Sequence, residues 1–242
     1  MTSPSKAQTM LAVSGLSKSF VLHTQGDAEI SVFSDISMDV LAGECVVLDG
    51  PSGAGKSTLM RMLYANYRAD GGSITVRHDD QRIDLTEAAP RVVLDIRRRT
   101  LGYVSQFLRV IPRVSTLDVV AEPLRALGVG ESESHDRAKH MLSRLNVPER
   151  LWSLAPATFS GGEQQRVNVA RGFVAELPIL LLDEPTASLD AINRQCVVGL
   201  IEDAKARGAA IVGIFHDREV RETVADRVFN MSETLVVSGE AA

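Results

Sequence analysis

The sequence is poor in cysteine, in basic charge and in long apolar runs, and each shortage excludes a class of protein. Its only cysteines, Cys45 and Cys196, lie far apart in apolar sequence without CxxC spacing. They therefore favour buried thiols in a reducing compartment over a disulfide or a metal site. No window approaches the roughly 18 apolar residues of a membrane helix, and the polar N-terminus predicts no secretory signal. We expect that the chain alone does not insert into a bilayer.

Basic residues are outnumbered by acidic ones, 26 against 31, which gives a formal net charge of −5. A general nucleic-acid binder neutralises phosphates with a basic surface or tail, so we expect no nucleic-acid partner. The 242 residues and the hydrophobic content of 45% are those of an ordinary globular protein. We find no internal repeat and no low-complexity segment.

Apolar, β-branched runs alternate with helix-like stretches along most of the chain. Strand candidates are CVVLDG (45–50), GSITVR (72–77), LGYVSQ (101–106), PILLLDE (178–184), AAIVGIF (209–215) and RVFNMS (227–232). Helix candidates cover 56–67, 163–177 and 191–208, the last of which stops at a glycine. Strand, loop, helix and strand in this order predict a three-layer α/β core with a largely parallel sheet.

Two regions depart from this alternation. Residues 107–157 contain helical periodicity at 116–128 and 134–147 without a strand candidate, which predicts an inserted helical lobe. The first 45 residues alternate apolar and polar side chains, which predicts an antiparallel edge sheet. We therefore expect one domain over 1–242. Its core and β-subdomain take up about 8–106 and 158–242, and its lobe about 107–157.

A glycine-rich loop follows the strand at 45–50. The segment GPSGAGKST matches GxxxxGK[ST] in full, follows a strand and opens a helix. Its glycines let backbone N–H groups point inward, Lys56 adds a mobile positive charge for the outer phosphates, and Ser57 offers a hydroxyl to magnesium. The expected nucleotide contacts are Gly50, Pro51, Ser52, Gly53, Ala54, Gly55, Lys56, Ser57 and Thr58.

Two carboxylates follow the most apolar strand. In ILLLDEP, four apolar residues place Asp183 at the carboxyl end of a buried strand. A charge there needs a cation, and the magnesium held by Ser57 would supply it. Glu184 stands beyond the strand edge, where a carboxylate can orient or deprotonate an attacking water. The alternative is that both acids cap a helix or face solvent.

Other candidates are weaker when each is taken alone. Gln106 could hold magnesium or the water, although a lone glutamine in a loop is more often solvated. His216 closes a strand at the edge where ligands of α/β sheets collect, with a structural role equally open. Phe20 could stack on adenine, although such a ring is more often core. Arg97–Arg99 is expected to be a solvated face, and Trp152 a packing anchor of the lobe.

The segment TFSGGEQQR, residues 158–166, resembles a second phosphate-binding device. Ser160 is a good helix N-cap, and the glycines after it permit close backbone approach. A nucleoside triphosphate carries about −4, whereas magnesium, one lysine and one helix terminus together return about +3.5. A second helix terminus would supply about the remaining half charge. The alternative is an ordinary capped helix.

Taken together, these motifs resemble the ATPase domain of the ATP-binding cassette (ABC) superfamily. The matching segments are GPSGAGKS, SQ, FSGGEQQRV, ILLLDEP, SLD and FH, in this order and over essentially the whole chain. The resemblance implies a P-loop NTPase fold with a three-layer α/β core, an antiparallel β edge subdomain and an inserted α-helical lobe. It implies ATP and Mg²⁺ as ligands, and ATP hydrolysis as the activity.

The resemblance also implies a head-to-tail dimer in which each protomer closes its partner's ATP with its signature loop. Ser160, Gly161 and Gly162 would contact the γ-phosphate held by the partner. Glu163 would complete the loop, and Asp190 of SLD would couple the two sites.

Three further roles come from the resemblance alone. Gln106 and His216 would face the γ-phosphate and act in hydrolysis together with Glu184 and Lys56, and Phe20 would take the adenine-stacking position. The second protomer would be the same chain or a paralogue. Phe159 and Glu163 depart from the leucine and glutamine that are commonest in the family, without changing the expectation of binding.

A finer resemblance is to the L subunits of bacterial carbon-phosphorus lyase systems, which break down phosphonates. It is carried by LYANYRADGGSITV, SQFLRVIPRVS, NVPERLWSLAPATFSGGEQQRVNVARGF and AAIVGIFHDREVRETVADRV. It implies a cytoplasmic ATPase that serves soluble lyase subunits in phosphonate metabolism.

Two alternatives to this function stay open. One is the energy-coupling ATPase of a membrane ABC transporter, and the discriminating surface is FLRVIPRVS (Phe107 to Ser115), which is apolar and cationic. The other is a scaffold that binds ATP without turnover, against which Glu184 argues.

Overall fold

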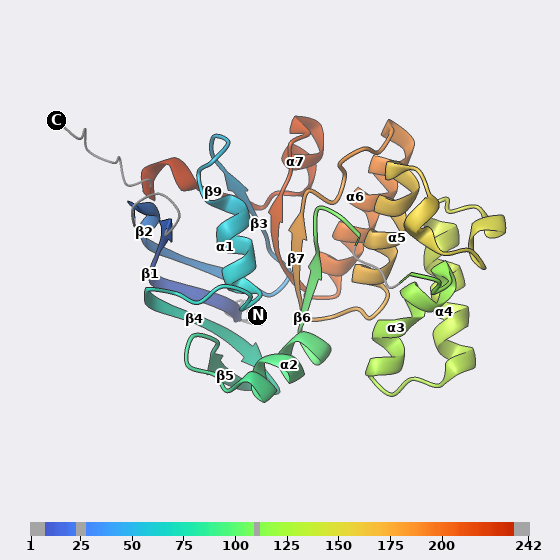
Figure 1. The fold of residues 1–242 in the computed structure, drawn as a ribbon, viewed down its shortest axis with the longest axis horizontal. Helices are drawn as coiled ribbons and strands as arrows, with labels where there is room; N and C mark the ends of the chain where they lie inside the picture. Colours follow the sequence, from blue (N-terminus) through green and yellow to red (C-terminus); the bar gives the residue numbers. More distant parts are fainter. Residues whose placement is uncertain (1–7, 23–27, 109–111, 235–242) are drawn as a thin grey trace, which may run out of the picture.

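Two β-sheets organise the chain (Figure 1). The computed structural model describes residues 8–22, 28–108 and 112–234. One sheet is antiparallel with the strand order β2-β1-β4-β5, and the other has the order β6-β7-β8-β3-β9. All neighbouring strands of the second sheet are parallel. The described residues thus contain both the predicted parallel core and the predicted antiparallel sheet.

The antiparallel sheet is covered on one face only. It consists of β1 (Thr9–Leu22), β2 (Ala28–Leu41), β4 (Gly71–His78) and β5 (Gln81–Asp84). In β4, Ile74, Val76 and His78 are buried, and the residues between them are more exposed. This alternation is that of a sheet with one solvated face. The strand predicted at 72–77 therefore belongs to this sheet.

The parallel sheet is buried on both faces. It consists of β6 (Leu101–Val104), β7 (Ile179–Asp183), β8 (Ala210–Ile214), β3 (Cys45–Asp49) and β9 (Arg227–Asn230). Every residue of β7 and β8 is buried. Leu181 of β7 faces one hydrophobic core, and Leu180 and Leu182 face the other. Such strands read as continuous apolar runs because layers cover both faces.

Helices make the two covering layers. Helix α1 (Lys56–Leu63) lies between the two sheets, where Leu59 and Leu63 share a core with Phe33 of β2. Helices α5 (Gly161–Phe173), α6 (Ala191–Ala206) and α7 (Arg218–Val224) contribute to the core on the opposite face. Helices α1 and α5 thus begin on opposite sides of the parallel sheet.

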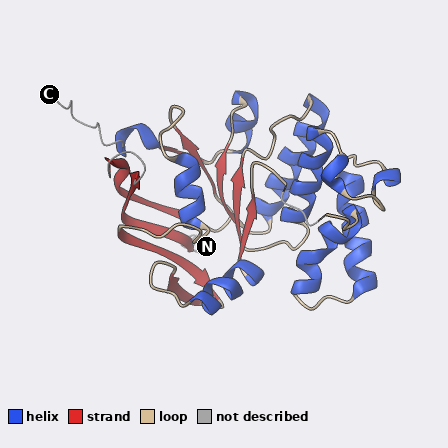
Figure 2. Ribbon diagram, in the orientation of Figure 1, coloured by secondary structure: helices blue, strands red, loops and turns tan. Residues whose placement is uncertain are grey.

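The inserted lobe consists of helices in its described part (Figure 2). Helices α3 (Thr116–Ala126) and α4 (Glu131–Arg144) pack with α5, and short 3-10 turns at Glu149–Leu151 and Pro156–Thr158 lead back to the core. Residues 109–111 of the predicted docking segment Phe107 to Ser115 lie outside the described residues. Trp152 anchors the lobe as predicted, because its ring packs on the core and its Nε1 donates to the Val147 carbonyl at 3.0 Å.

Arg97–Arg99 is not simply a solvated face, which corrects the sequence prediction. These arginines end α2 (Pro90–Arg99), a helix that the sequence analysis did not predict. Arg97 donates two hydrogen bonds to the Tyr64 carbonyl, at 3.0 and 2.6 Å. Arg99 pairs with Asp95 one turn earlier and with Asp79, in the turn between β4 and β5. Two of the three arginines therefore tie α2 down.

The two cysteines differ in their surroundings. Cys45 is fully buried in β3, and burial raises the pKa of its thiol to about 12. Cys196 on α6 is half-buried, and its Sγ lies 3.4 Å from Nδ2 of Asn146. Among the described residues, no helix combines the length and the apolar character needed to span a membrane.

Candidate active site

The glycine loop joins β3 to α1 and is tightly wound. Gly50, Gly53 and Gly55 all have positive φ angles, of 146°, 84° and 84°. At Gly53 no atom lies within 4 Å of the position that a Cβ would take. Backbone conformation alone therefore selects glycine there, since other residues rarely adopt such a φ.

Lys56 folds back over this loop. Its Nζ donates to the carbonyl oxygens of Gly50 and Pro51, at 2.6 and 2.9 Å. No side chain caps the N-terminus of α1, where Gly55 is the N-cap and Ser57 is exposed. The first N–H groups of a helix lack intrahelical acceptors and carry partial positive charge. The loop, the ammonium and the helix terminus together suit a phosphate group.

Asp183 carries a buried oxygen without a partner. Only 4% of this residue is exposed, at the end of β7. Its Oδ2 accepts from the Tyr103 hydroxyl at 2.9 Å, and its Oδ1 has no hydrogen-bond partner among the described residues. Burial raises the pKa of this carboxyl, and the hydrogen bond from Tyr103 opposes the rise. A buried carboxylate with one unpaired oxygen has the chemistry of a ligand for a divalent cation.

Glu184 is held from two sides by the residues predicted to act with it. Its Oε1 lies 2.6 Å from Nε2 of His216, and its Oε2 accepts from Nε2 of Gln106 at 3.1 Å. The three residues follow β7, β8 and β6, which are neighbours in the sheet. Because the carboxyl ends of parallel strands meet at one edge, the three loops converge there. A carboxylate so oriented can position and deprotonate a water molecule.

The backbone of Glu184 is itself unusual. Its φ is 55°, a left-handed conformation that costs a non-glycine residue energy. Its N–H donates to the Ile214 carbonyl at 3.1 Å, and its own carbonyl accepts from Nε2 of Gln165 at 3.2 Å. Neighbouring elements thus fix the conformation that presents this carboxylate.

The signature loop, which begins at Ser160, forms a cap at the start of α5 through its own hydrogen bonds. The Ser160 N–H and hydroxyl donate to Oε2 of Glu163 at 3.0 and 2.8 Å, and the Glu163 N–H donates back to Ser160 Oγ at 3.3 Å. The hydrogen bonds from Ser160 lower the pKa of Glu163. Neither residue bonds to the glycine loop in the described part of the chain. The capped helix that the sequence left as the alternative is therefore present in the single chain.

The signature loop packs directly on the loop after Glu184. A Cβ on Gly162 would lie 2.9 Å from the carbonyl oxygen of Ser188, closer than real Cβ atoms come. Asp190, at the end of that loop, caps α6 by accepting from the N–H and Nδ2 of Asn193, at 2.8 and 2.9 Å. These bonds lower the pKa of Asp190. A movement of Gly162 toward Ser188 would therefore displace the loop after Glu184.

Phe20 lies on β1, beside other ring and cationic groups. It meets Tyr67 edge-on with ring centroids 5.6 Å apart, and the Lys18 ammonium lies 5.2 Å from its ring centroid. It is half-buried and does not belong to either fully buried core. None of these ring contacts is with the glycine loop.

The sequence analysis missed Tyr103, Gln165 and Asn168. Tyr103 bonds to Asp183 only because β6 lies beside β7, and strand order is not written in a single sequence. Gln165 and Asn168 left no clear signal, because Gln165 stands among the polar residues Glu163, Gln164 and Arg166 in the sequence.

Known proteins resemble this chain over most of its length. A model of the ABC transporter family matches residues 33–187. The uncharacterised ABC transporter ATP-binding protein YvrO of Bacillus subtilis is 32% identical over 94% of this chain and 96% of its own length. The macrolide export ATP-binding/permease protein MacB of Agrobacterium fabrum is 33% identical over 96% of this chain. The chain spans only 35% of that relative.

A solved structure shares the architecture. The dimeric ATP-binding cassette MJ0796, described in a post-hydrolysis state bound to ADP and Pi, superposes with a TM-score of 0.82 and 27% identity. The match covers 91% of this chain and 94% of that one. The predicted fold class, the ATPase cassette, is thereby confirmed.

Proposed function

This chain belongs to the ABC transporter family, and from that premise we propose that it is the ATP-hydrolysing subunit of a membrane transporter. The relative that it matches over nearly its full length is named as a transporter ATP-binding protein. MacB, of which this chain covers only about a third, is named as an ATP-binding/permease protein. A separate membrane protein would supply the permease, and the ATPase would work on its cytoplasmic side.

The observation that carries hydrolysis is the placement of Glu184 between Gln106 and His216. The carboxylate is the general base for the attacking water, Gln106 orients that water, and His216 faces the γ-phosphate. The side chain of His216 is 71% exposed, so it remains free to reach a bound nucleotide. Lys56 would leave the loop carbonyls and bind the outer phosphates.

ATP and Mg²⁺ fit the groups around this base. The glycine loop from Gly50 to Thr58 would hold the phosphates, and Phe20 would stack on the adenine. Asp183, Ser57 and Gln106 would hold Mg²⁺, which neutralises charge on the phosphates. The unpaired oxygen of Asp183 supports this, because the cation would relieve a buried charge that the protein leaves unmatched.

A dimer would complete the site. Ser160, Gly161, Gly162 and Glu163 would close over the nucleotide of a second protomer, and Asp190 would link the two sites. Two features support this arrangement. Helices α1 and α5 begin on opposite faces of the parallel sheet, and the cassette that resembles this chain is described as a dimer.

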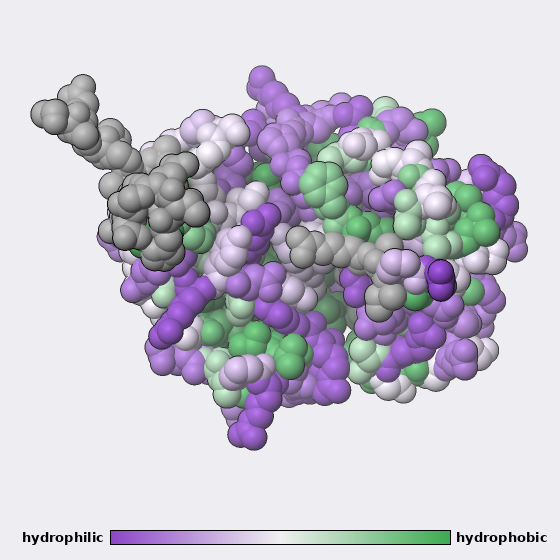
Figure 3. Space-filling model, viewed as in Figure 1, coloured by the Kyte–Doolittle hydropathy of each residue, from purple (hydrophilic) through white to green (hydrophobic). Residues whose placement is uncertain are grey.

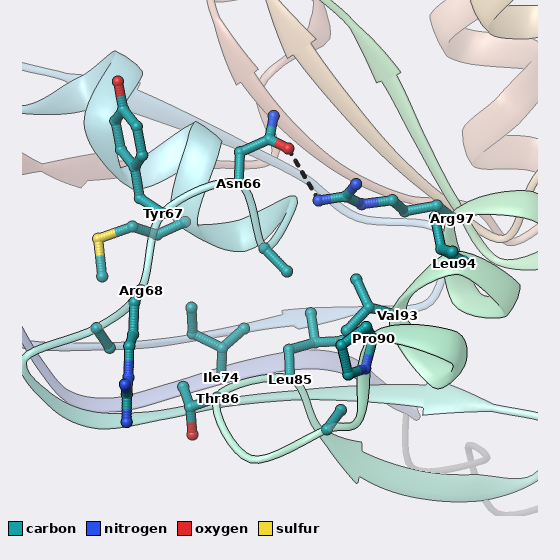
Figure 4. A pocket seen from close by; sticks show the side chains of 14 residues that line it. Asn66, Tyr67, Arg68, Ile74, Leu85, Thr86, Pro90, Val93, Leu94 and Arg97 are labelled. Carbon is teal, nitrogen blue, oxygen red and sulfur yellow. Dashed lines mark hydrogen bonds between the residues drawn. The ribbon is translucent and has the colours of Figure 1, made fainter.

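The surface that would receive the permease lies between the core and the lobe. A cavity of about 400 Å³ runs from Leu94 and Arg97 on α2 to Pro123 on α3 and Arg171 on α5. A second cavity of about 490 Å³ shares Leu94 and Arg97 with it and continues past Ile74 (Figure 4). A cluster of hydrophobic residues lies at the lower left of Figure 3, over the region of β4 and α2. A neighbouring cavity of about 320 Å³ shares Tyr64 and Arg171 with the first and is also lined by Gln106 and Phe107, so a segment docked here would lie beside the hydrolysis site.

An accessory role in a carbon-phosphorus lyase system is the second candidate. The similarity of residues 105–115 and 146–173 to its L subunits favours it. Its partner would be a soluble lyase subunit on the same surface. The transporter names of the relatives favour the first candidate.

The catalytic proposal is tested with Glu184→Gln. We expect turnover of ATP to fall at least about a hundredfold, in the range that removal of a general base produces, while the variant accumulates as an ATP-bound dimer in size-exclusion chromatography. Glu149→Gln, an exposed glutamate of the lobe, is the matched control and should hydrolyse ATP like the wild type. Normal turnover in Glu184→Gln would refute the assignment.

The choice of partner is tested by purification of the untagged protein from native cells. Recovery with a membrane protein from the membrane fraction supports the transporter. Co-elution with soluble subunits from the cytosol, without a membrane protein, would instead support the lyase role.

A further inference from the structure

Two buried amides distinguish α5 from the other helices around the site. Gln165 and Asn168 are each only 5% exposed, whereas their neighbours Val167, Val169 and Ala170 supply the apolar core. Residues three apart share a face of a helix, so both amides point the same way. A buried amide needs hydrogen-bond partners to offset its loss of water.

Gln165 binds the backbone on which Glu184 is mounted. Its Nε2 donates to the carbonyl oxygen of Glu184 at 3.2 Å and to that of Pro185 at 3.0 Å. This is the point where the chain leaves β7 with the left-handed conformation of Glu184. The amide therefore holds the turn that aims the carboxylate.

Asn168 binds the opposite side of the same site. Its Nδ2 donates to the carbonyl oxygen of Ser105 at 2.5 Å. Ser105 directly precedes Gln106, whose amide donates to the Glu184 carboxylate. One face of α5 thus holds the backbone of both segments that meet over the attacking water.

We propose that Gln165 and Asn168 are positioning residues for ATP hydrolysis, which fix Glu184 and Gln106 relative to the helix that begins at Ser160. The proposal rests on the proposed function, because it assigns the support of that function's base. A displacement of α5 when Ser160 engages the partner's nucleotide would move both catalytic segments together. Occupancy of one site would in this way bias hydrolysis in the other.

The first experiment removes one donor and keeps the volume. Gln165→Met retains the length of the side chain but cannot donate. We expect kcat to fall about tenfold, which corresponds to about 1.4 kcal/mol, while the KM for ATP stays close to the wild-type value. The melting temperature should fall by only roughly 2–4 °C per kcal/mol of stability lost when the Glu184 and Pro185 carbonyls lose this donor. Asn168→Leu should behave in the same way and serves if the first variant does not fold.

Gln195→Met is the control. This amide is exposed on α6 and lies outside the segments that carry Glu184, Gln106 or the signature loop. We expect its kcat to stay within about twofold of the wild-type value, well below the effect of one lost hydrogen bond near the base. An equal loss in Gln195→Met and Gln165→Met would overturn the assignment.

The second experiment tests whether Gln165 acts through Glu184. In single-turnover assays on the Glu184→Gln background, Gln165→Met should lower the residual rate less than about twofold, because the base is already absent. A full tenfold loss there would mean a general structural role and overturns the proposal. A wild type without ATP hydrolysis refutes the proposed function itself, whereas an active wild type with unchanged Gln165→Met refutes only this inference.

Discussion

The two glycine-bearing loops of this protein look alike in sequence but differ in how they are satisfied. The glycine loop before α1 ends in a helix terminus without a side-chain cap, and its only ammonium rests on its own carbonyls. The signature loop before α5 is closed by the reciprocal hydrogen bonds of Ser160 and Glu163. The first loop is thus ready for an anion in the single chain. In the second loop, Ser160 and Glu163 already satisfy each other's hydrogen bonds without a nucleotide bound to the same chain.

The two loops also use glycine for different physical reasons. Gly53 has open space around it and a φ of 84°, so its conformation requires glycine. Gly162 has the space of a Cβ taken by the Ser188 carbonyl, so close packing requires glycine there. Glycine is required at position 53 by the backbone conformation, and at position 162 by the contact with the loop after Glu184. The variants below test this difference, from the largest expected effect to the smallest.

Lys56→Ala should have the largest effect, because it removes the only cation of the glycine loop. We expect ATP affinity to fall about a hundredfold, equivalent to about 2.8 kcal/mol. Isothermal titration calorimetry with the single chain measures this loss. Lys139→Ala on α4 is the control, since within the described part of the chain its ammonium pairs only with the neighbouring Asp136. An unchanged affinity in Lys56→Ala would erase the contrast between the loops.

Ser160→Arg should separate binding from turnover. Ser160 is exposed, so the single chain should keep its ATP affinity. Its folding stability should fall by about 1 kcal/mol, because the substitution removes a helix cap. Hydrolysis should fall at least about tenfold, which corresponds to about 1.4 kcal/mol, because the side chain blocks the approach of a second protomer. Ser143→Arg, also exposed but on α4, controls for the added charge. Loss of ATP binding by monomers would assign the signature loop to the chain's own site.

Substitutions of Gly53 and Gly162 should differ in kind. Gly162→Ala places a methyl group against a backbone oxygen and should cost about 1–3 kcal/mol of unfolding free energy. Gly53→Ala should cost about 1–2 kcal/mol through its left-handed φ, and Gly53→Asn should cost less because asparagine tolerates that region. Urea denaturation measures all three. If Gly53→Ala and Gly53→Asn destabilise equally, conformation is not what selects this glycine.

The smallest expected effect concerns the pH dependence of the signature cap. Because Ser160 lowers the pKa of Glu163 in the folded state, this carboxylate adds stability above its ordinary pKa of about 4.5. That stability is lost as the pH falls through the lowered folded pKa. We expect a contribution under about 1 kcal/mol, because the group is near the surface. Glu163→Gln should remove it, seen as a shallower decline of unfolding free energy below pH 5.

Much of the fold can be predicted from the local sequence pattern. Where the prediction fails, a particular residue or segment explains the failure. The burial of β7 and β8 on both faces is visible in PILLLDE and AAIVGIF. Helix α1, predicted over 56–67, ends at Leu63 because Ala65 takes a left-handed φ of 55°. Helix α2 escaped prediction because it is short and ends in Arg97–Arg99, a run that the sequence analysis interpreted as a solvated face and not as the last turn of a helix.

The candidate site divides in the same way. Asp183, Glu184 and the glycine loop could be predicted because each depends on a strand end and a short motif. Glu184 contacts Gln106 and His216 because β6, β7 and β8 are neighbours in the parallel sheet. This strand order could not be predicted from the sequence. The hydrogen bond of Tyr103 to Asp183 depends on the same order.

The unequal cysteines have a practical consequence. The thiol of Cys45 is sealed in β3 with a pKa of about 12, so it stays protonated and unreactive at neutral pH. Cys196 is half-buried on α6, against Asn146 at the end of the lobe. A maleimide dye should therefore attach at one position of the natural chain, at the seam between lobe and core. Fluorescence from that dye would follow the lobe through the ATP cycle without any added cysteine.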